Sequence, residues 1–138
     1  MKFHIDGTLP KDNEIFVFGS NLSGIHGAGA ALVAKNLYRA KLGFGVGLQG
    51  GSYAIPTKDH HIITLSLKDI IPHIKEFCNF VDEHRIYNPD IGFFITRIGC
   101  GLAGYDDSDI APLFKMCNAK NCSFANEWKP YLDYKEEM

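Results

Sequence analysis

The sequence predicts an α/β fold with a mostly parallel or mixed β-sheet. Short apolar runs rich in β-branched and aromatic residues alternate with stretches of helical periodicity, which is typical of α/β proteins. Two of these runs end in glycine-rich loops, and parallel sheets bind ligands outside the carboxyl ends of their strands. The 138 residues fit one domain, long enough to bury a core without a metal or disulfide.

Four strands are expected. The run EIFVFG at 14–19 is β-branched and aromatic, which predicts a buried strand. The run IGFFIT at 91–96 predicts a second one. Shorter strands are expected at 53–56 and 121–126.

Three helices are expected among these strands. Residues 28–40 are rich in helix formers and begin with small side chains, so the first turn can approach a strand or a ligand. Apolar residues repeat at helical spacing over 70–85, with Asp69 as the expected N-cap and Pro72 in the first turn. A short helix is expected over 109–116.

Composition and charge exclude several classes of protein. With 46% hydrophobic and 22% charged residues the chain is globular, not disordered. The formal charge is −2 and no basic run occurs, so binding of free nucleic acid is not expected. The first residues lack the apolar core of a signal peptide, and no apolar stretch could span a membrane, which predicts a cytoplasmic protein with no membrane partner. The oligomeric state is left open.

The four cysteines, Cys78, Cys100, Cys117 and Cys122, are expected to be reduced thiols in such a protein. Their spacing does not supply the two closely spaced ligand pairs of a structural zinc site. No metal and no cofactor are therefore expected. The single tryptophan, Trp128, is expected to close the core near the carboxyl terminus.

Glycines cluster in the first part of the chain, with nine of the fourteen between Gly19 and Gly51. A glycine-rich loop that runs into a helix presents backbone N–H groups and a positive dipole end, which suit a phosphate or diphosphate. The alternative is that these glycines serve only tight turns. No Walker A motif is present, and the G-x-G-x-x-G at 45–50 follows a helix and precedes a strand, the reverse of the dinucleotide-binding arrangement.

Two segments contain the glycine loops, FGSNLSGIHGAGAALVAK at 18–35 and TRIGCGLAGYDDSDIAPLF at 96–114. Together they resemble the macrodomain superfamily, whose members bind ADP-ribose and its derivatives. The resemblance covers roughly 14–126 and is greatest to compact bacterial or phage-type members. It implies a single three-layer macrodomain-like domain over 1–138, with a polar tail at 129–138 and with the glycine loops at the carboxyl edge of the sheet.

The resemblance also implies a ligand site. Asn21 would meet the distal ribose, which Tyr105 would approach or cover, and Asp6 would read the adenine amino group. Backbone groups would hold the rest of the ligand, the diphosphate above all, at Gly27, Ala28, Gly29, Gly99, Gly101, Leu102, Ala103 and Gly104. Two further residues of the loops are candidates on their own chemistry: His26 as a phosphate contact or acid/base, and Cys100, for which a small buried filler is the alternative.

Catalysis is suggested by one branch of the superfamily, in which a lysine attacks the anomeric carbon and an aspartate assists. The lysine of that branch follows a strand ending in I-T-K, and YAIPTK at 53–58 is similar, which places Lys58 there. The aspartate directly follows GCGL, where this sequence has Ala103, and the nearest carboxylates are Asp106 and Asp107. Lys58 as nucleophile or cation and Asp106 as acid/base are the catalytic candidates; a solvated lysine and a helix cap are the alternatives.

The function predicted from these observations is binding of ADP-ribose or a related adenine nucleotide, with hydrolysis of ADP-ribosyl linkages as its catalytic extension. The expected partner is ADP-ribose or an ADP-ribosylated substrate. One alternative is a non-catalytic module that senses or sequesters a nucleotide. Another is an interaction protein whose glycine loops are purely structural.

Overall fold

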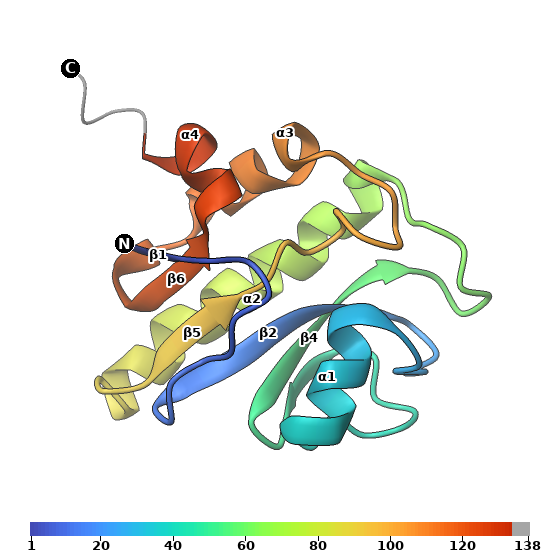
Figure 1. Cartoon of the computed structure of the whole chain (residues 1–138), viewed down its shortest axis with the longest axis horizontal. Helices are drawn as coiled ribbons and strands as arrows, with labels where there is room; N and C mark the ends of the chain where they lie inside the picture. Colours follow the sequence, from blue (N-terminus) through green and yellow to red (C-terminus); the bar gives the residue numbers. More distant parts are fainter. Residues whose placement is uncertain (134–138) are drawn as a thin grey trace.

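The computed structural model describes residues 1–133, which form an α/β domain around one sheet (Figure 1). Its strands are β1 (Lys2–His4), β2 (Glu14–Asn21), β3 (Gly47–Gln49), β4 (Ser52–Lys58), β5 (Gly92–Ile95) and β6 (Cys122–Ala125). Its helices are α1 (Gly29–Leu37), α2 (Leu67–Tyr87), α3 (Asp107–Ile110) and α4 (Lys129–Leu132), with 3-10 helices η1 (Ala111–Met116), η2 (Ala119–Asn121) and η3 (Asn126–Trp128). Over the same residues, no helix is long and apolar enough to cross a membrane.

The strand order is β1-β6-β5-β2-β4-β3, and every neighbouring pair is parallel except the antiparallel β3–β4 pair. The predicted α/β fold with a mostly parallel sheet is confirmed. Because β1, β5, β2 and β4 run in the same direction, their carboxyl ends meet at one edge. The segments that follow these strands therefore meet there.

Helices cover both faces of the sheet, with α1 in front of β2 and β4 and α2 behind (Figure 1). The alternation along β2 explains this arrangement, because successive side chains of a strand point to opposite faces. Phe16 and Phe18 pack with Ala31 and Ala34 of α1. Val17 joins the larger core on the α2 face, which also contains residues of α3, η1 and α4.

The start of α2 differs from the prediction. Ser66 is the N-cap, since its Oγ accepts a hydrogen bond from the N–H of Asp69 at 3.3 Å. The prediction that Asp69 caps the helix is wrong, because its backbone is already helical. Pro72 therefore lies beyond the first turn, inside the helix.

Other boundaries also differ. The short edge strands β1 and β3 were not predicted, because three residues show no usable periodicity. The helix expected over 109–116 is the short α3 followed by η1. The expected polar tail is helical at its start, where Leu132 of α4 is buried; residues 134–138 lie outside the described part.

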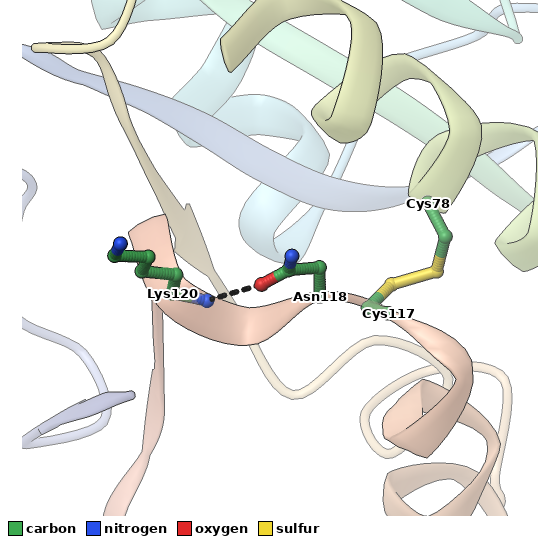
Figure 2. Close-up of a disulfide and its surroundings, with 4 residues drawn as sticks. All are labelled: Cys78, Cys117, Asn118 and Lys120. Atoms are coloured by element: carbon green, nitrogen blue, oxygen red, sulfur yellow. Dashed lines mark hydrogen bonds between the residues drawn. A yellow bond between two sulfur atoms is a disulfide. The ribbon is translucent and has the colours of Figure 1, made fainter.

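The prediction of four reduced cysteines is wrong for two of them. Cys78 of α2 and Cys117, which follows η1, form a disulfide on the α2 face (Figure 2). Their Cα atoms are 4.9 Å apart, within the range for a disulfide. Cys100 and Cys122 are free, and burial raises the pKa of the Cys122 thiol to about 12.

The expectation for Trp128 is confirmed. Its side chain is fully buried and packs against Phe114 and Phe124. The carboxyl-terminal elements are thereby part of the core.

Candidate functional site

A cavity of about 610 Å³ lies on the α1 face and reaches the carboxyl edge of the sheet. Its volume is within the range of small-molecule sites. One wall is the start of α1, and the opposite wall is the connection 5–13, which passes over β5 on the same face (Figure 1). The loops after β2, β4 and β5 enclose the end of the cavity.

The start of α1 presents unpartnered backbone donors to this cavity. The N-cap residue, Ala28, makes no side-chain cap, and the N–H groups of Gly29, Ala30 and Ala31 have no intrahelical acceptor. All four residues line the cavity. This end of the helix therefore suits an anion.

The loop after β5 presents a second set of donors. Hydrogen bonds from Tyr105 N–H to the Gly99 carbonyl and from Gly104 N–H to the Gly101 carbonyl close this loop. In the described chain, the N–H groups of Gly101, Leu102 and Ala103 have no backbone acceptor. These three residues line the cavity too, so two sets of residues with free N–H groups border one space.

Asn21, at the end of β2, is buried and lines the cavity. Its side chain binds its own loop: Oδ1 accepts from Ile25 N–H at 3.1 Å and Nδ2 donates to the Ile25 carbonyl at 2.8 Å. The amide therefore shapes the glycine loop. One Nδ2 hydrogen is left for a ligand.

Lys58 ends β4 directly beside Asn21 and also lines the cavity. The neighbouring carboxylate, Asp59, instead accepts the N–H groups of Ile63 and His61, which lowers its pKa. In the part of the chain that the structure describes, Lys58 forms no ion pair. A lysine with no carboxylate partner among the described residues thus borders the same space as the free N–H groups.

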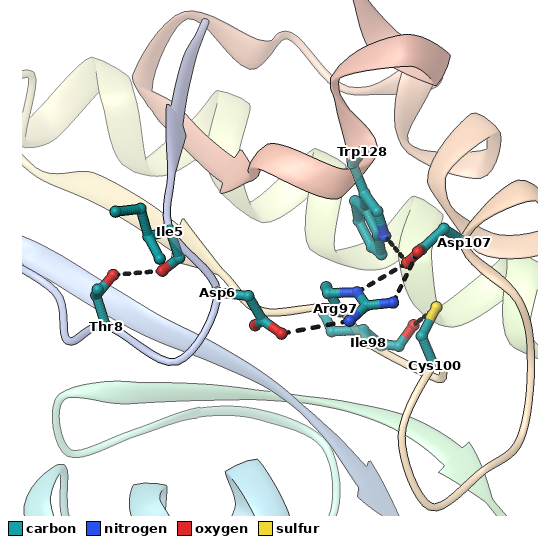
Figure 3. A network of polar contacts seen from close by, with 8 residues as sticks. All are labelled: Ile5, Asp6, Thr8, Arg97, Ile98, Cys100, Asp107 and Trp128. Carbon is teal, nitrogen blue, oxygen red and sulfur yellow. Dashed lines mark hydrogen bonds and ion pairs between the residues drawn. The ribbon is translucent and has the colours of Figure 1, made fainter.

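A chain of polar contacts forms the wall near Arg97 (Figure 3). Arg97 follows β5 and binds Asp107 through two hydrogen bonds, from Nε at 2.9 Å and from Nη2 at 2.7 Å. Its Nη1 lies 3.4 Å from Asp6 of the connection 5–13. Trp128 Nε1 donates to Asp107 at 2.7 Å, so the network reaches the buried core.

The part of the cavity near the middle of the sheet is apolar. Phe16, Phe94, Leu9 and Val33 line it, and His4 stacks on the Phe94 ring with 3.7 Å between centroids. Flat apolar walls of this kind suit an aromatic ring. The cavity thus combines an apolar compartment with an anion-binding end.

Most of the predicted site residues line this cavity. They are Asp6, Asn21, Gly27, Ala28, Gly29, Lys58, Gly99, Cys100, Gly101, Leu102 and Ala103. Cys100 is half-buried, and desolvation raises its pKa to about 12, which does not favour a nucleophilic thiolate.

Four predicted residues do not line the cavity. His26 is buried, bonds the Lys41 carbonyl through Nε2 and packs edge-on against Phe18. Tyr105 donates its hydroxyl to the Leu65 carbonyl at 2.6 Å. Asp106 forms a capping box with Asp109 at the start of α3, and Gly104 occupies a turn with φ +88°.

The comparisons with known proteins point to one fold. No family model matches the chain, and no curated protein matches its sequence. In structure the chain is similar to the macrodomain of Mycobacterium tuberculosis DarG, with a TM-score of 0.63 and 20% identity over 90% of this chain and 95% of that chain. The chain has a macrodomain fold. The fold that the two glycine-loop segments suggested is thereby confirmed.

Sequence reasoning assigned no role to Arg97 or to the apolar lining of this cavity, although Arg97 lies in the quoted segment TRIGCGL. A basic residue next to a glycine loop that follows a strand was a usable signal. The sequence contained no such signal for Phe16 and Phe94, because an aromatic side chain in a buried strand ordinarily belongs to the hydrophobic core.

The Arg97–Asp107 pair makes the stability of this protein depend on pH. Hydrogen bonds from Arg97 lower the pKa of Asp107, so the pair stabilises the fold above the ordinary carboxyl pKa near 3.9. That stabilisation is lost as the pH falls through the lower pKa of the folded state. We expect Asp107→Asn to destabilise the protein clearly at pH 6 and less and less below about pH 4.

Urea unfolding of both proteins at pH 6 and pH 3 measures this difference. The exposed Asp12, changed to asparagine, is the control for removing one charge. A difference between wild type and Asp107→Asn that stays constant over this pH range would contradict the prediction.

Proposed function

We propose that this protein binds ADP-ribose or a closely related adenine nucleotide. The observation that carries the proposal is the pairing of two sets of unpartnered N–H groups, at 29–31 and 101–103, across one cavity. A diphosphate needs several converging donors, and backbone groups of this kind supply them without a metal. Over residues 1–133 no cluster of three potential metal ligands occurs.

The rest of the cavity supports the same class of ligand. The compartment lined by Phe16 and Phe94 suits the adenine ring, and Asp6 lies at its border as an acceptor for the amino group. At the opposite end, Asn21 and Lys58 are the polar groups available to a ribose or to the bond that joins it to a carrier. Binding of ADP-ribose by macrodomains in general agrees with this assignment.

We further propose Lys58 as the group through which binding extends to hydrolysis of an ADP-ribosyl linkage. Its place in the cavity and its lack of a carboxylate partner among residues 1–133 support this role. Cleavage passes through an oxocarbenium-like state, which a carboxylate usually assists. Asp106 caps α3, and Ala103 has no carboxylate. In the described chain, the carboxylate that lines the cavity is that of Asp6, which lies at the apolar end and not beside Lys58. Binding is therefore the primary proposal.

Calorimetric and thermal-shift titration with ADP-ribose tests the binding proposal, with AMP and ribose 5-phosphate as partial ligands. At about 100 times Kd a ligand adds about 2.7 kcal/mol to stability. We expect this to raise the Tm by roughly 5–10 °C for ADP-ribose and clearly less for either fragment. The absence of any shift at millimolar ADP-ribose would contradict the proposal and favour the reading in which the glycine loops are structural.

Release of ADP-ribose from an ADP-ribosylated protein and from ADP-ribosylated DNA tests the hydrolytic extension. Wild type and Lys58→Ala are compared, with Lys75→Ala of α2 as the matched control. Turnover by wild type and Lys75→Ala but not by Lys58→Ala supports a catalytic lysine. Tight binding without turnover by any of the three proteins would assign the chain to the non-catalytic alternative.

A further inference from the structure

Asp6 lies near the start of the connection 5–13, whose far end is anchored where the Asn13 carbonyl accepts from Gly92 N–H and Asn13 Nδ2 donates to the Asp90 carbonyl. The connection 5–13 contains no helix or strand and turns at Gly7, which has φ +86°. Thr8 bonds back to the Ile5 carbonyl, and this contact is internal to the turn. Among the described residues, the ion pair with Arg97 is the polar contact that links the Asp6 carboxylate to the body of the protein (Figure 3).

Arg97 is itself held firmly on its other side. Two of its nitrogens bind the two oxygens of Asp107, the bidentate geometry that fixes the orientation of a guanidinium group. Asp107 is fixed in turn by the indole N–H of Trp128, whose ring is fully buried. A rigid series of contacts therefore runs from the core to the cavity wall.

The Asp6 carboxylate is divided between this network and the cavity. Oδ2 faces Arg97, and no hydrogen bond of the described residues uses Oδ1. Asp6 and Arg97 both line the cavity, next to the apolar compartment of Phe94. A charged acceptor placed beside a compartment for a flat ring can select a base that presents a donor there.

We propose that Arg97 is a positioning residue that holds Asp6 in place to select a 6-amino purine over a 6-oxo purine. The proposal rests on the proposed binding of an adenine nucleotide and adds the origin of its base selectivity. Arg97 acts through Asp6, and it in turn depends on Asp107. Because the hydrogen bond between the base and Asp6 involves a charged acceptor, selectivity of at least about tenfold is expected for the wild type.

The test compares the Kd values of ADP-ribose and of its hypoxanthine analogue, inosine diphosphate ribose, by calorimetry. Arg97→Met and Arg97→Lys are expected to reduce the ratio of the two Kd values to within about threefold, because neither side chain bridges two carboxylates in a fixed plane. Arg97→Lys keeps the positive charge beside Asp107, so it still tests the proposal if Arg97→Met does not fold. Arg85→Met of α2, away from the cavity, is the matched control and is expected to keep the wild-type ratio.

Asp6→Asn provides an independent readout. Its amide oxygen still accepts from Arg97, while its NH₂ group donates to a 6-oxo group, so the preference is expected to reverse toward the hypoxanthine ligand. A merely structural role of Arg97 predicts equal weakening of both ligands and an unchanged ratio, which would overturn the proposal and leave the proposed function standing. Failure of the wild type to bind either ligand would overturn both.

Discussion

Replacing Gly101 by glutamate is expected to abolish ADP-ribose binding without destabilising the fold. A Cβ atom at Gly101 meets no other atom within 4 Å, and the residue does not have a left-handed φ. The added carboxylate would lie among the N–H groups proposed to hold the diphosphate. Two like charges about 4 Å apart repel by about 4 kcal/mol at an effective dielectric constant of 20. The Kd is therefore expected to rise at least about 100-fold.

Calorimetry measures the Kd of this variant, and thermal unfolding measures its stability. Ile86→Glu is the matched control, because Ile86 is exposed on α2 and the substitution adds the same charge on the opposite face of the sheet. Gly101→Ala, which adds one methyl group, is expected to cause a much smaller loss. Native affinity in Gly101→Glu would show that the loop after β5 does not hold the anion.

Replacing Gly45 by alanine is expected to cause a large loss of stability. A Cβ atom there would lie 2.1 Å from the Asn21 carbonyl oxygen, so the backbone must move. Forced overpacking costs about 3 kcal/mol. We expect the Tm to fall by roughly 10 °C. Because Asn21 shapes the first glycine loop, the affinity for ADP-ribose is expected to fall with it.

Thermal unfolding and calorimetry of Gly45→Ala give both quantities. Gly51→Ala is the matched control, since a Cβ atom there lies 3.8 Å or more from its nearest neighbours in Tyr38. The control is expected to keep the wild-type Tm within about 2 °C. Equal stability of the two variants would contradict the structural reading of the glycines at 45–50. These glycines match a dinucleotide-binding motif in sequence, but Gly45 lets its loop pack against Asn21, and Gly50 approaches Tyr38 and Arg39 instead.

The sequence was most informative where one local pattern determines one structure. Neighbouring residues are enough to recognise the apolar runs of β2 and β5 and the glycine loops that follow them. The prediction of a ligand site at the carboxyl edge of the sheet depended on these elements. The role of Asp106 as a helix cap could be considered from the sequence for the same reason, because a capping box spans only four residues.

Features that depend on distant residues could not be predicted in this way. Arg97 meets Asp6 across 91 positions of the chain, and the disulfide joins Cys78 to a residue 39 positions later. The three residues of β1 form a strand because β6 offers them a free edge, not because of their own pattern. Such contacts arise from the assembled fold, so no local rule identifies them.

The pairing of β1 with β6 has a consequence for the order in which the protein is made. Lys2 lies beside Ser123, so the first strand cannot join the sheet until the residues of β6, about 120 positions later, have left the ribosome. Asp6 follows that strand, and its partner network ends at Trp128. A nascent chain therefore carries the connection 5–13 from the start but cannot fix it in place until β6 and Trp128 have been made, so this wall of the cavity is the last to be completed.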